Sequence, residues 1–182
     1  MNRTRSLRHG HGLHRWLALA MKVLPLASVL FLSFLPAITV AVPTIGLVRP
    51  YYGLAVVFYW SIYRTDLLPL VGLFVLGIVY DFGSGGLVGL TPLLYLLLRG
   101  VIGELAAQFR LQGFLVNWGF WLLVVVLAMT IDSVVNSLVS GRQVSIMILA
   151  VDAIVSWLLF PPIFMVMEWL RQKYLGDIEA GL

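Results

Sequence analysis

The sequence predicts an all-α integral membrane protein, and its composition is the first of two observations that predict this class. Of the 182 residues, 61% are hydrophobic and only 11% are charged, and the mean hydropathy is +1.00. Soluble domains carry about 25% charged residues because their surface has to meet water. Too few charges remain here to cover such a surface, so we expect one helical domain embedded in a lipid bilayer.

The second observation is a series of apolar runs separated by short polar turns. Crossing the hydrocarbon core of a bilayer takes about 20 residues of helix. We expect six transmembrane helices, over residues 16–42, 51–63, 67–81, 91–110, 114–139 and 145–170. The second and third runs approach 20 residues only with their flanks, so a re-entrant hairpin is the alternative for that pair.

The first run, Trp16–Val42, follows a basic stretch, as the apolar region of a secretory signal peptide does. Signal peptides carry apolar regions of about 7–15 residues, and this run is much longer. We therefore expect it to be retained as the first helix.

Capping residues and prolines set the expected ends of the later helices. Asp66 is a suitable N-cap for a helix that begins at Leu67, and Thr91 is a suitable N-cap for one that begins at Pro92. Proline also disrupts helix interiors, so Pro161–Pro162 predicts a kink in the last helix.

The positive charges predict the orientation of the six helices. Cytoplasmic loops carry an excess of lysine and arginine. With the N-terminus in the cytoplasm, ten basic residues fall on the cytoplasmic side: Arg3, Arg5, Arg8, Arg15, Lys22, Arg64, Arg99, Arg110, Arg171 and Lys173. Only Arg49 and Arg142 fall outside. This bias also explains the net charge of +4, so we expect no nucleic-acid partner.

The same distribution predicts three parts of the chain. Residues 1–15 are expected to form a flexible basic cytoplasmic arm, residues 16–171 the six-helix membrane domain, and residues 172–182 a cytoplasmic tail. Both termini are then cytoplasmic.

The sequence shows no group of residues that is typical of a catalytic site. The chain has no cysteine, and His9, His11 and His14 lie on the basic arm, which offers no fixed metal geometry. Nothing resembles a nucleophile beside its base or a phosphate-binding loop. We therefore expect no enzyme, no cofactor and no metal.

Intramembrane polar residues form the first candidate site. Asp132 and Asp152 each lie about 9 residues from the turn at 140–143, so they share one depth in the bilayer. Asn136 follows Asp132 by one helical turn, and Ser156 follows Asp152 in the same way. The pattern indicates either an interhelical hydrogen-bond network, which is favoured, or a proton, cation or ligand site.

Glycines around an acid form the second candidate site. Asp81 is followed four and eight residues later by Gly85 and Gly89, which allow a sharp turn or close helix packing. The pattern indicates either a glycine-rich turn with an acid at its mouth or a packing and docking site for a partner.

A ridge of small residues on the first helix is the third candidate. Ser33, Ala37 and Ala41 repeat every four residues, which favours close contact with a helix of this chain or of a partner.

The stretch LGIVYDFGSGGLVGLTPLLYLLL resembles the rod shape-determining protein MreD family. That family has a glycine–leucine run, an acid with glycines four and eight positions later, and then a leucine-rich helix. Here these positions are Gly77, Asp81, Gly85 and Gly89, and the likeness extends over Leu47–Leu98. The basic arm is longer than the family pattern.

The resemblance implies a non-enzymatic inner-membrane scaffold of the cell-wall elongation machinery, required for rod shape and lateral peptidoglycan synthesis. It implies direct association with MreC, and direct or indirect association with MreB and the peptidoglycan synthases, while homo-oligomerisation stays open. The implied fold resembles the substrate-binding subunit of energy-coupling-factor transporters. Two alternatives follow: a vitamin-like small-molecule-binding subunit of a transporter, and a small proton-coupled transporter.

Overall fold

The structure is a computed structural model, and it describes residues 23–34, 41–42, 46–47, 50–141 and 145–179. Over these residues the chain is helical, apart from two short strands that pair antiparallel, β1 (Ala41–Val42) and β2 (Gly46–Leu47). The predicted all-helical fold class is therefore confirmed.

The described helices follow one another with short connections. After the helix Val23–Phe34 come α2 (Tyr52–Tyr63), the 3₁₀ turn η2 (Thr65–Leu67), α3 (Leu70–Ser84), α4 (Leu90–Leu111), α5 (Phe114–Ser140), α6 (Ile146–Leu158) and α7 (Phe160–Glu179).

Three helical segments are long and apolar enough to cross a membrane: Leu90–Leu111, Phe114–Val139 and Ile146–Lys173, which joins α6 and α7. The helix Val23–Phe34, α2 and α3 are apolar but shorter. At about 1.5 Å per residue, the 12 residues of α2 extend about 18 Å, against about 30 Å of hydrocarbon. The six predicted spans thus correspond to three long helices and three short ones.

The predicted extent of the first helix is wrong at its C-terminal end. Ala41 and Val42 lie in β1, not on a helix. The sequence between Pro36 and Pro43 is rich in β-branched residues, which favour extended backbone, and proline cannot sit inside a helix without breaking its hydrogen bonds. Apolar length alone therefore overestimated this helix.

The predicted start of α3 is also wrong. The helix begins at Leu70 with Pro69 as its N-cap, while Asp66 lies in η2 and pairs with Arg64 at 3.2 Å. A residue that precedes proline is pushed away from helical dihedrals, and this restriction falls on Leu68. The helix therefore cannot run continuously from Leu67 across the proline.

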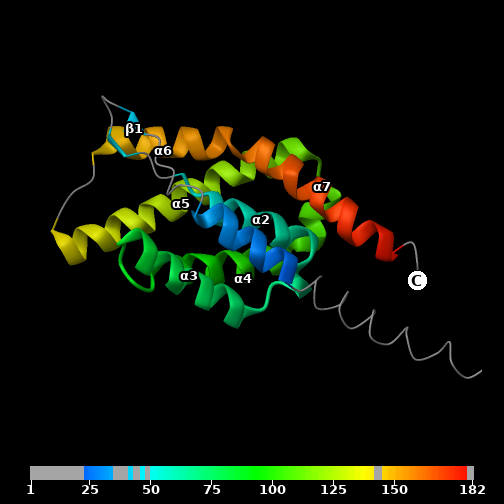
Figure 1. Ribbon diagram of the computed structural model, residues 1–182. Helices are drawn as coiled ribbons and strands as arrows, with labels where there is room; N and C mark the ends of the chain where they lie inside the picture. The colour runs from blue at the N-terminus through cyan, green and yellow to red at the C-terminus, as the bar shows by residue number, and fades with distance from the viewer. Residues whose placement is uncertain (1–22, 35–40, 43–45, 48–49, 142–144, 180–182) are drawn as a thin grey trace, which may run out of the picture.

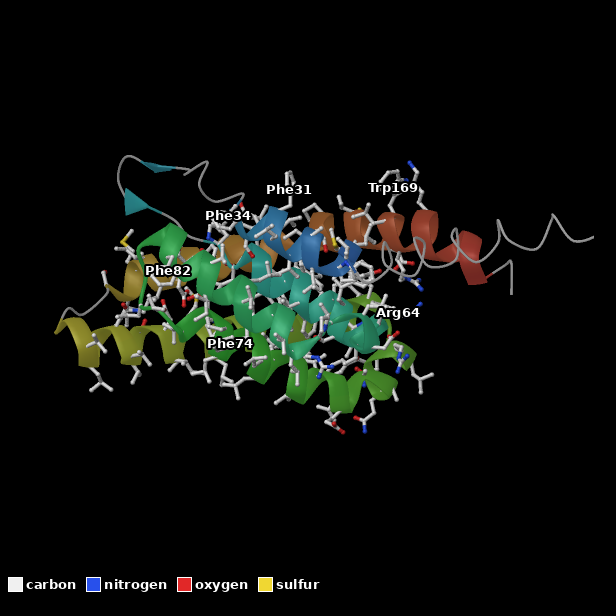
Figure 2. All side chains as sticks on the ribbon, turned by 60° about the horizontal axis from the view of Figure 1, so that its bottom comes forward. Phe31, Phe34, Arg64, Phe74, Phe82 and Trp169 are labelled. Carbon is white, nitrogen blue, oxygen red and sulfur yellow. The ribbon has the colours of Figure 1, made fainter. Side chains whose placement is uncertain are left out.

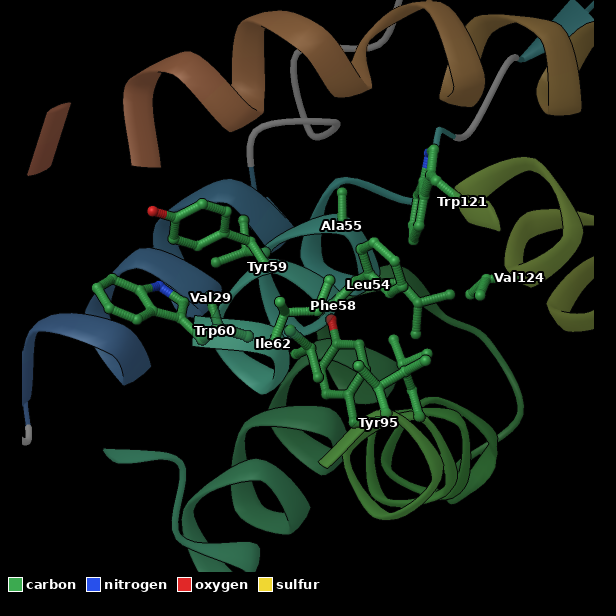
Figure 3. Packing of buried hydrophobic residues seen from close by; sticks show 14 of the residues in the cluster. Val29, Leu54, Ala55, Phe58, Tyr59, Trp60, Ile62, Tyr95, Trp121 and Val124 are labelled. Atoms are coloured by element: carbon green, nitrogen blue, oxygen red, sulfur yellow. The ribbon is translucent and has the colours of Figure 1, made fainter. Parts of the chain in front are cut away.

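The central element of the fold is α2. Its residues Gly53 to Ile62 are all buried, including the large rings of Phe58, Tyr59 and Trp60. Figure 1 shows α6 and α7 along one side of α2 and α3 and α4 along the other. Figure 3 shows the side chains of α2 packed among residues of the first helix, α4 and α5. A helix that is apolar on every face is stable only when neighbours enclose it.

The outer helices keep apolar side chains on their outward faces. Val71 is 75% exposed, Leu127 is 59% exposed and Leu138 is 81% exposed. Patches of this kind are rare on soluble monomers. They form the surface that lipid would cover.

A proline pair divides the last helical segment into α6 and α7, as predicted. Pro161 has no N–H to donate to the carbonyl of Trp157, four residues earlier. That carbonyl accepts a hydrogen bond of 3.0 Å from the indole of Trp118, and the adjacent carbonyl of Ser156 accepts one of 3.0 Å from Trp121. Two tryptophans of α5 therefore hold the break in the helix.

The two ends of the helix bundle differ in charge. Arg64 and Trp169 lie at one end in Figure 2, and Phe82 lies toward the other. At the first end, Glu168 accepts hydrogen bonds from Tyr59 at 2.6 Å and from Arg171 at 2.5 Å, which ties α2 to α7. We call it the basic end, because four arginines gather around the end of α2. Arg64 follows α2 and Arg110 lies in the last turn of α4, the Arg99 guanidinium donates to the carbonyls of Leu68 and Thr65, and Arg171 lies over the ring of Tyr63.

Candidate functional site

A cavity of about 410 Å³ lies at the end opposite the basic end. It is enclosed where α2 and α6 begin, where α3 turns into α4, and along the second half of α5. Its polar lining includes Asp81, Asp132, Asp152, Tyr51, Tyr80 and Tyr95. We call this feature the acidic cavity.

Asp81 lies in the wall of the acidic cavity and is only 3% exposed. Its Oδ2 atom accepts hydrogen bonds from the backbone N–H groups of Gly89 at 2.8 Å and Thr91 at 3.3 Å. The first N–H groups of a helix have no partner within that helix, so an acid at this point caps it. Asp81 of α3 thus caps α4 from outside.

This capping corrects the predicted start of α4. The helix begins at Leu90 with Gly89 as its N-cap, two residues before the expected N-cap Thr91. Thr91 and Pro92 lie inside the first turn instead. The acceptor that Thr91 was expected to supply comes from Asp81, ten residues earlier in the chain.

The two glycines after Asp81 serve the backbone of the turn. Gly85 ends α3 with φ = 65°, and Gly89 precedes α4 with φ = 105°. These values favour glycine, because other residues meet a steric clash there. A Cβ at either position would have no atom within 4 Å, so close packing is not their role.

Gly77 is the glycine that permits close packing of two helices. A Cβ built on this residue would lie 2.5 Å from the backbone nitrogen of Pro92 and 2.6 Å from its Cα. Helices α3 and α4 therefore cross at Gly77 with their backbones almost in contact. The four residues of the repeat from Gly77 to Gly89 therefore have three roles. Gly77 is the crossing point, Asp81 is the cap, and Gly85 and Gly89 are the turn residues.

Asp132 and Asn136 line the acidic cavity from α5. The Asn136 amide donates to Asp132 Oδ1 at 3.0 Å, and the Tyr51 hydroxyl donates to Asp132 Oδ2 at 3.3 Å. The contact with Tyr51 joins α5 to the start of α2. The structure thus places the predicted helical pair in one hydrogen-bonded group.

Asp152 and Ser156, the other half of the predicted network, lie on α6 and have separate surroundings. Asp152 lines the acidic cavity together with Asp132. Ser156 is buried and does not line it; its hydroxyl accepts a hydrogen bond of 3.2 Å from the backbone N–H of Tyr51. Tyr51 therefore links both predicted halves.

The small-residue ridge is placed only in part. Ser33 is buried against α2 and α4, where its hydroxyl lies 2.9 Å from that of Tyr95. A Cβ on Gly53 would collide with both hydroxyl groups, so this glycine permits the contact. Ala37 lies outside the described residues, and Ala41 lies in β1.

Sequence reasoning missed the tyrosines of the acidic cavity and the hydrogen-bonded group around Glu168. Tyr51, Tyr80 and Tyr95 stand in apolar runs, where aromatic residues usually signal only burial or an interfacial position. The spacing of Glu168 and Arg171, one turn apart on a helix, was the only available signal for that group.

The acidic cavity can accept hydrogen-bond donors and positive charge. Three carboxylates and several hydroxyl groups line it, and no lysine or arginine is among the described residues of its wall. Its volume falls within the range of about 300–1,000 Å³ that small-molecule sites occupy. The arrangement is suited to binding.

Comparison with known proteins gives one match. The family model for the rod shape-determining protein MreD matches residues 18–170 of this chain. No curated protein and no solved structure matches it.

Proposed function

This chain belongs to the rod shape-determining protein MreD family, and on that premise we propose that it is a scaffold that binds MreC at its acidic cavity. The family consists of non-enzymatic, shape-determining membrane proteins of the cell elongation machinery. The chain is accordingly a multi-pass protein of the cytoplasmic membrane. The proposal concerns how it acts there.

The proposed orientation places the basic end in the cytoplasm and the acidic cavity on the periplasmic side. The support is the distribution of lysine and arginine, which accumulate in cytoplasmic loops. In this arrangement six helices cross or enter the bilayer, and both termini are cytoplasmic. The proposal also assigns residues 1–15 to a cytoplasmic arm before the membrane domain and residues 172–182 to a cytoplasmic tail after it.

The acidic cavity is the proposed binding site because it is the place where polar groups and open volume coincide. Its wall is made from parts of six helices, so a bound segment would contact several of them at once. A bitopic protein such as MreC carries a juxtamembrane segment just outside its membrane helix. That segment is the occupant we propose, and its contacts would fix the position of MreC relative to the bundle.

The remaining partners follow from this position. Association with MreB and with the peptidoglycan synthases of the lateral wall would be direct or would pass through MreC. The family match supports the setting, the elongation machinery, and the choice among these partners is our proposal.

Site-specific photo-crosslinking tests the MreC site without disturbing the fold. A photoreactive phenylalanine at Leu87 or Ile148, both in the wall of the acidic cavity, should crosslink to the periplasmic juxtamembrane segment of MreC. The same group at Trp169, at the basic end, should not reach that segment. Crosslinks from Trp169 alone, mapped by mass spectrometry, would exclude the cavity as the site.

Glycine substitutions give a second test. Gly85→Leu and Gly89→Leu place a side chain where φ is positive, which should distort the hairpin and abolish MreC co-purification. Gly100→Leu is the control, because this exposed residue has ordinary helical backbone and open space around it. Normal MreC binding by both hairpin variants, in well-inserted protein, would contradict the proposal.

A small-molecule-binding transporter subunit is the second candidate, and the volume of the acidic cavity favours it. Depletion of the protein in a rod-shaped host separates the two. Rounded cells that still contain MreC indicate the scaffold, whereas a vitamin requirement with normal shape indicates the transporter subunit.

A further inference from the structure

The residues that line the acidic cavity indicate what kind of chemical group it can bind. Its carboxylates come from three different helices: Asp81 from α3, Asp132 from α5 and Asp152 from α6. They therefore reach the cavity from separate elements of the fold, and a bound group can be contacted by carboxyl groups of more than one helix.

The spacing of these acids decides what kind of cation would suit them. Within the part of the chain that the structure describes, no three acidic or histidine side chains are grouped closely enough to hold a metal ion. A metal ion needs oxygen ligands at about 2.0–2.6 Å. A larger cation, whose charge is spread over several N–H donors, can reach separated carboxylates.

Aromatic groups in the same wall favour an organic cation as well. Tyr51, Tyr80 and Tyr95 contribute rings and hydroxyl groups to the cavity. Ring faces attract ammonium and guanidinium groups, and the attraction grows where water is excluded.

One further side chain in the wall has a buried hydroxyl group that lacks a hydrogen bond within the described part of the chain. Ser133 lines the cavity, and its hydroxyl oxygen is shielded from solvent and has no hydrogen-bond partner among the described residues. Buried hydroxyl groups are normally paired, because an unpaired one costs about 1–3 kcal/mol. A rotation of the Ser133 side chain toward the cavity would let Oγ accept a hydrogen bond from an N–H donor bound there.

We propose that the acidic cavity binds the guanidinium or ammonium group of a basic side chain, presented by the juxtamembrane segment of the partner protein. This rests on the proposed function for the source of the cation, while the chemistry rests on the cavity wall alone. Bidentate N–H donors match carboxylate geometry, so an arginine suits the site best.

A matched pair of small probes tests the chemistry in the full-length protein. N-acetylargininamide carries the guanidinium, and N-acetylcitrullinamide has nearly the same shape with a neutral group in its place. Calorimetry in detergent should show saturable binding of the arginine probe at least tenfold tighter than the citrulline probe. Equal binding of the two, or binding of neither, would overturn the proposal.

Substitutions then locate the binding. Asp132→Asn and Asp152→Asn keep the size of the side chain and should each weaken binding of the arginine probe about tenfold or more. Asp66→Asn, an exposed acid at the basic end, should leave it unchanged. If wild-type binding persists in both cavity variants, with normal thermal unfolding, the cation binds elsewhere and the proposal is wrong.

The chain's own arginines need a separate control. Arg49 and Arg142 lie outside the described residues, and in sequence they flank the segments that form this end of the bundle. Arg49→Gln and Arg142→Gln should leave probe binding within about twofold of wild type. A tenfold gain in either variant would show that the chain fills its own cavity, which overturns a partner as the source.

Failure of this inference and failure of the proposed function give different results. Replacing each lysine and arginine of the MreC juxtamembrane segment by glutamine should identify one whose loss prevents co-purification. If MreC co-purifies through the cavity but tolerates every replacement, the scaffold remains and the cation is wrong. If the arginine probe binds while MreC never co-purifies, the scaffold is wrong and the cation site remains.

Discussion

Replacing Gly77 by alanine adds one methyl group where α3 and α4 cross. That methyl group would lie 2.5 Å from the nitrogen of Pro92 and 2.7 Å from its Cδ. Ordinary contact begins near 3.4 Å, so α4 would have to retreat by about 0.9 Å. The colliding atoms belong to the backbone and to a proline ring, and neither can rotate away.

Two opposing terms set the size of the effect. Alanine is favoured over glycine inside a helix by about 1 kcal/mol, which stabilises the variant. Overpacking a close contact costs about 1–3 kcal/mol, and a contact with rigid backbone lies near the upper end. We expect Gly77→Ala to lower the free energy of unfolding by about 1–2 kcal/mol, the difference of these terms.

Thermal unfolding in detergent measures this difference against a matched control. For a chain of this size, about 1–2 kcal/mol corresponds to a fall in Tm of about 2–8 °C. Gly100→Ala carries the same substitution in α4 with no atom within 4 Å, so its Tm should stay the same or rise. A Gly77→Ala protein as stable as Gly100→Ala would refute the crossing-point explanation.

Two further predictions concern the contacts that join helices. Asp81→Ala removes the acceptor of two backbone N–H groups and should cost about 1–3 kcal/mol for each, seen as a lower Tm. Asp66→Ala, an exposed ion pair, should cost less than about 1 kcal/mol, and equal losses would contradict the capping role. Trp121→Phe keeps most of the ring but leaves a buried carbonyl without its indole donor, so it should cost about 1–3 kcal/mol. Trp169→Phe, 56% exposed, should change stability by about 0.5 kcal/mol or less.

The extent of the long helices could be predicted from the sequence. The run expected at 114–139 corresponds to α5, Phe114–Ser140, and the run expected at 91–110 corresponds to α4, Leu90–Leu111. Both predictions rest on apolar length and on the short polar turns between the runs, and both signals are local. Local signals of this kind are readable in one sequence.

Helix starts that depend on distant residues could not be predicted. The N-terminal cap of α4 comes from Asp81, and no local pattern around Thr91 reveals this. The prediction for the end of the first helix was wrong for a different reason, because apolar residues occur in buried strands as well as in helices. Apolar content fixes where a chain avoids water and leaves its backbone conformation open.

The candidate site could be predicted in part. The helical spacing of Asp132 and Asn136 places both on one face, and they are hydrogen bonded there. That Asp81 shares a cavity with them depends on how α3 packs against its neighbours, and spacing carries no such information. Tyr51 hydrogen bonds to Asp132, which lies 81 residues later in the chain, and to Ser156, which lies 105 residues later. Only the folded chain defines contacts over such separations.

The burial of α2 from Gly53 to Ile62 has a consequence for how the protein is made. Helices leave the ribosome in chain order, and α2 appears long before α7, which covers it and holds Tyr59 through Glu168. At about 18 Å it is too short to rest in the bilayer as an independent span. The contacts that α7 makes with the centre of the fold therefore form last, and a chain cut short before α7 leaves Phe58 and Tyr59 without the rings of Phe160 and Phe164 that cover them.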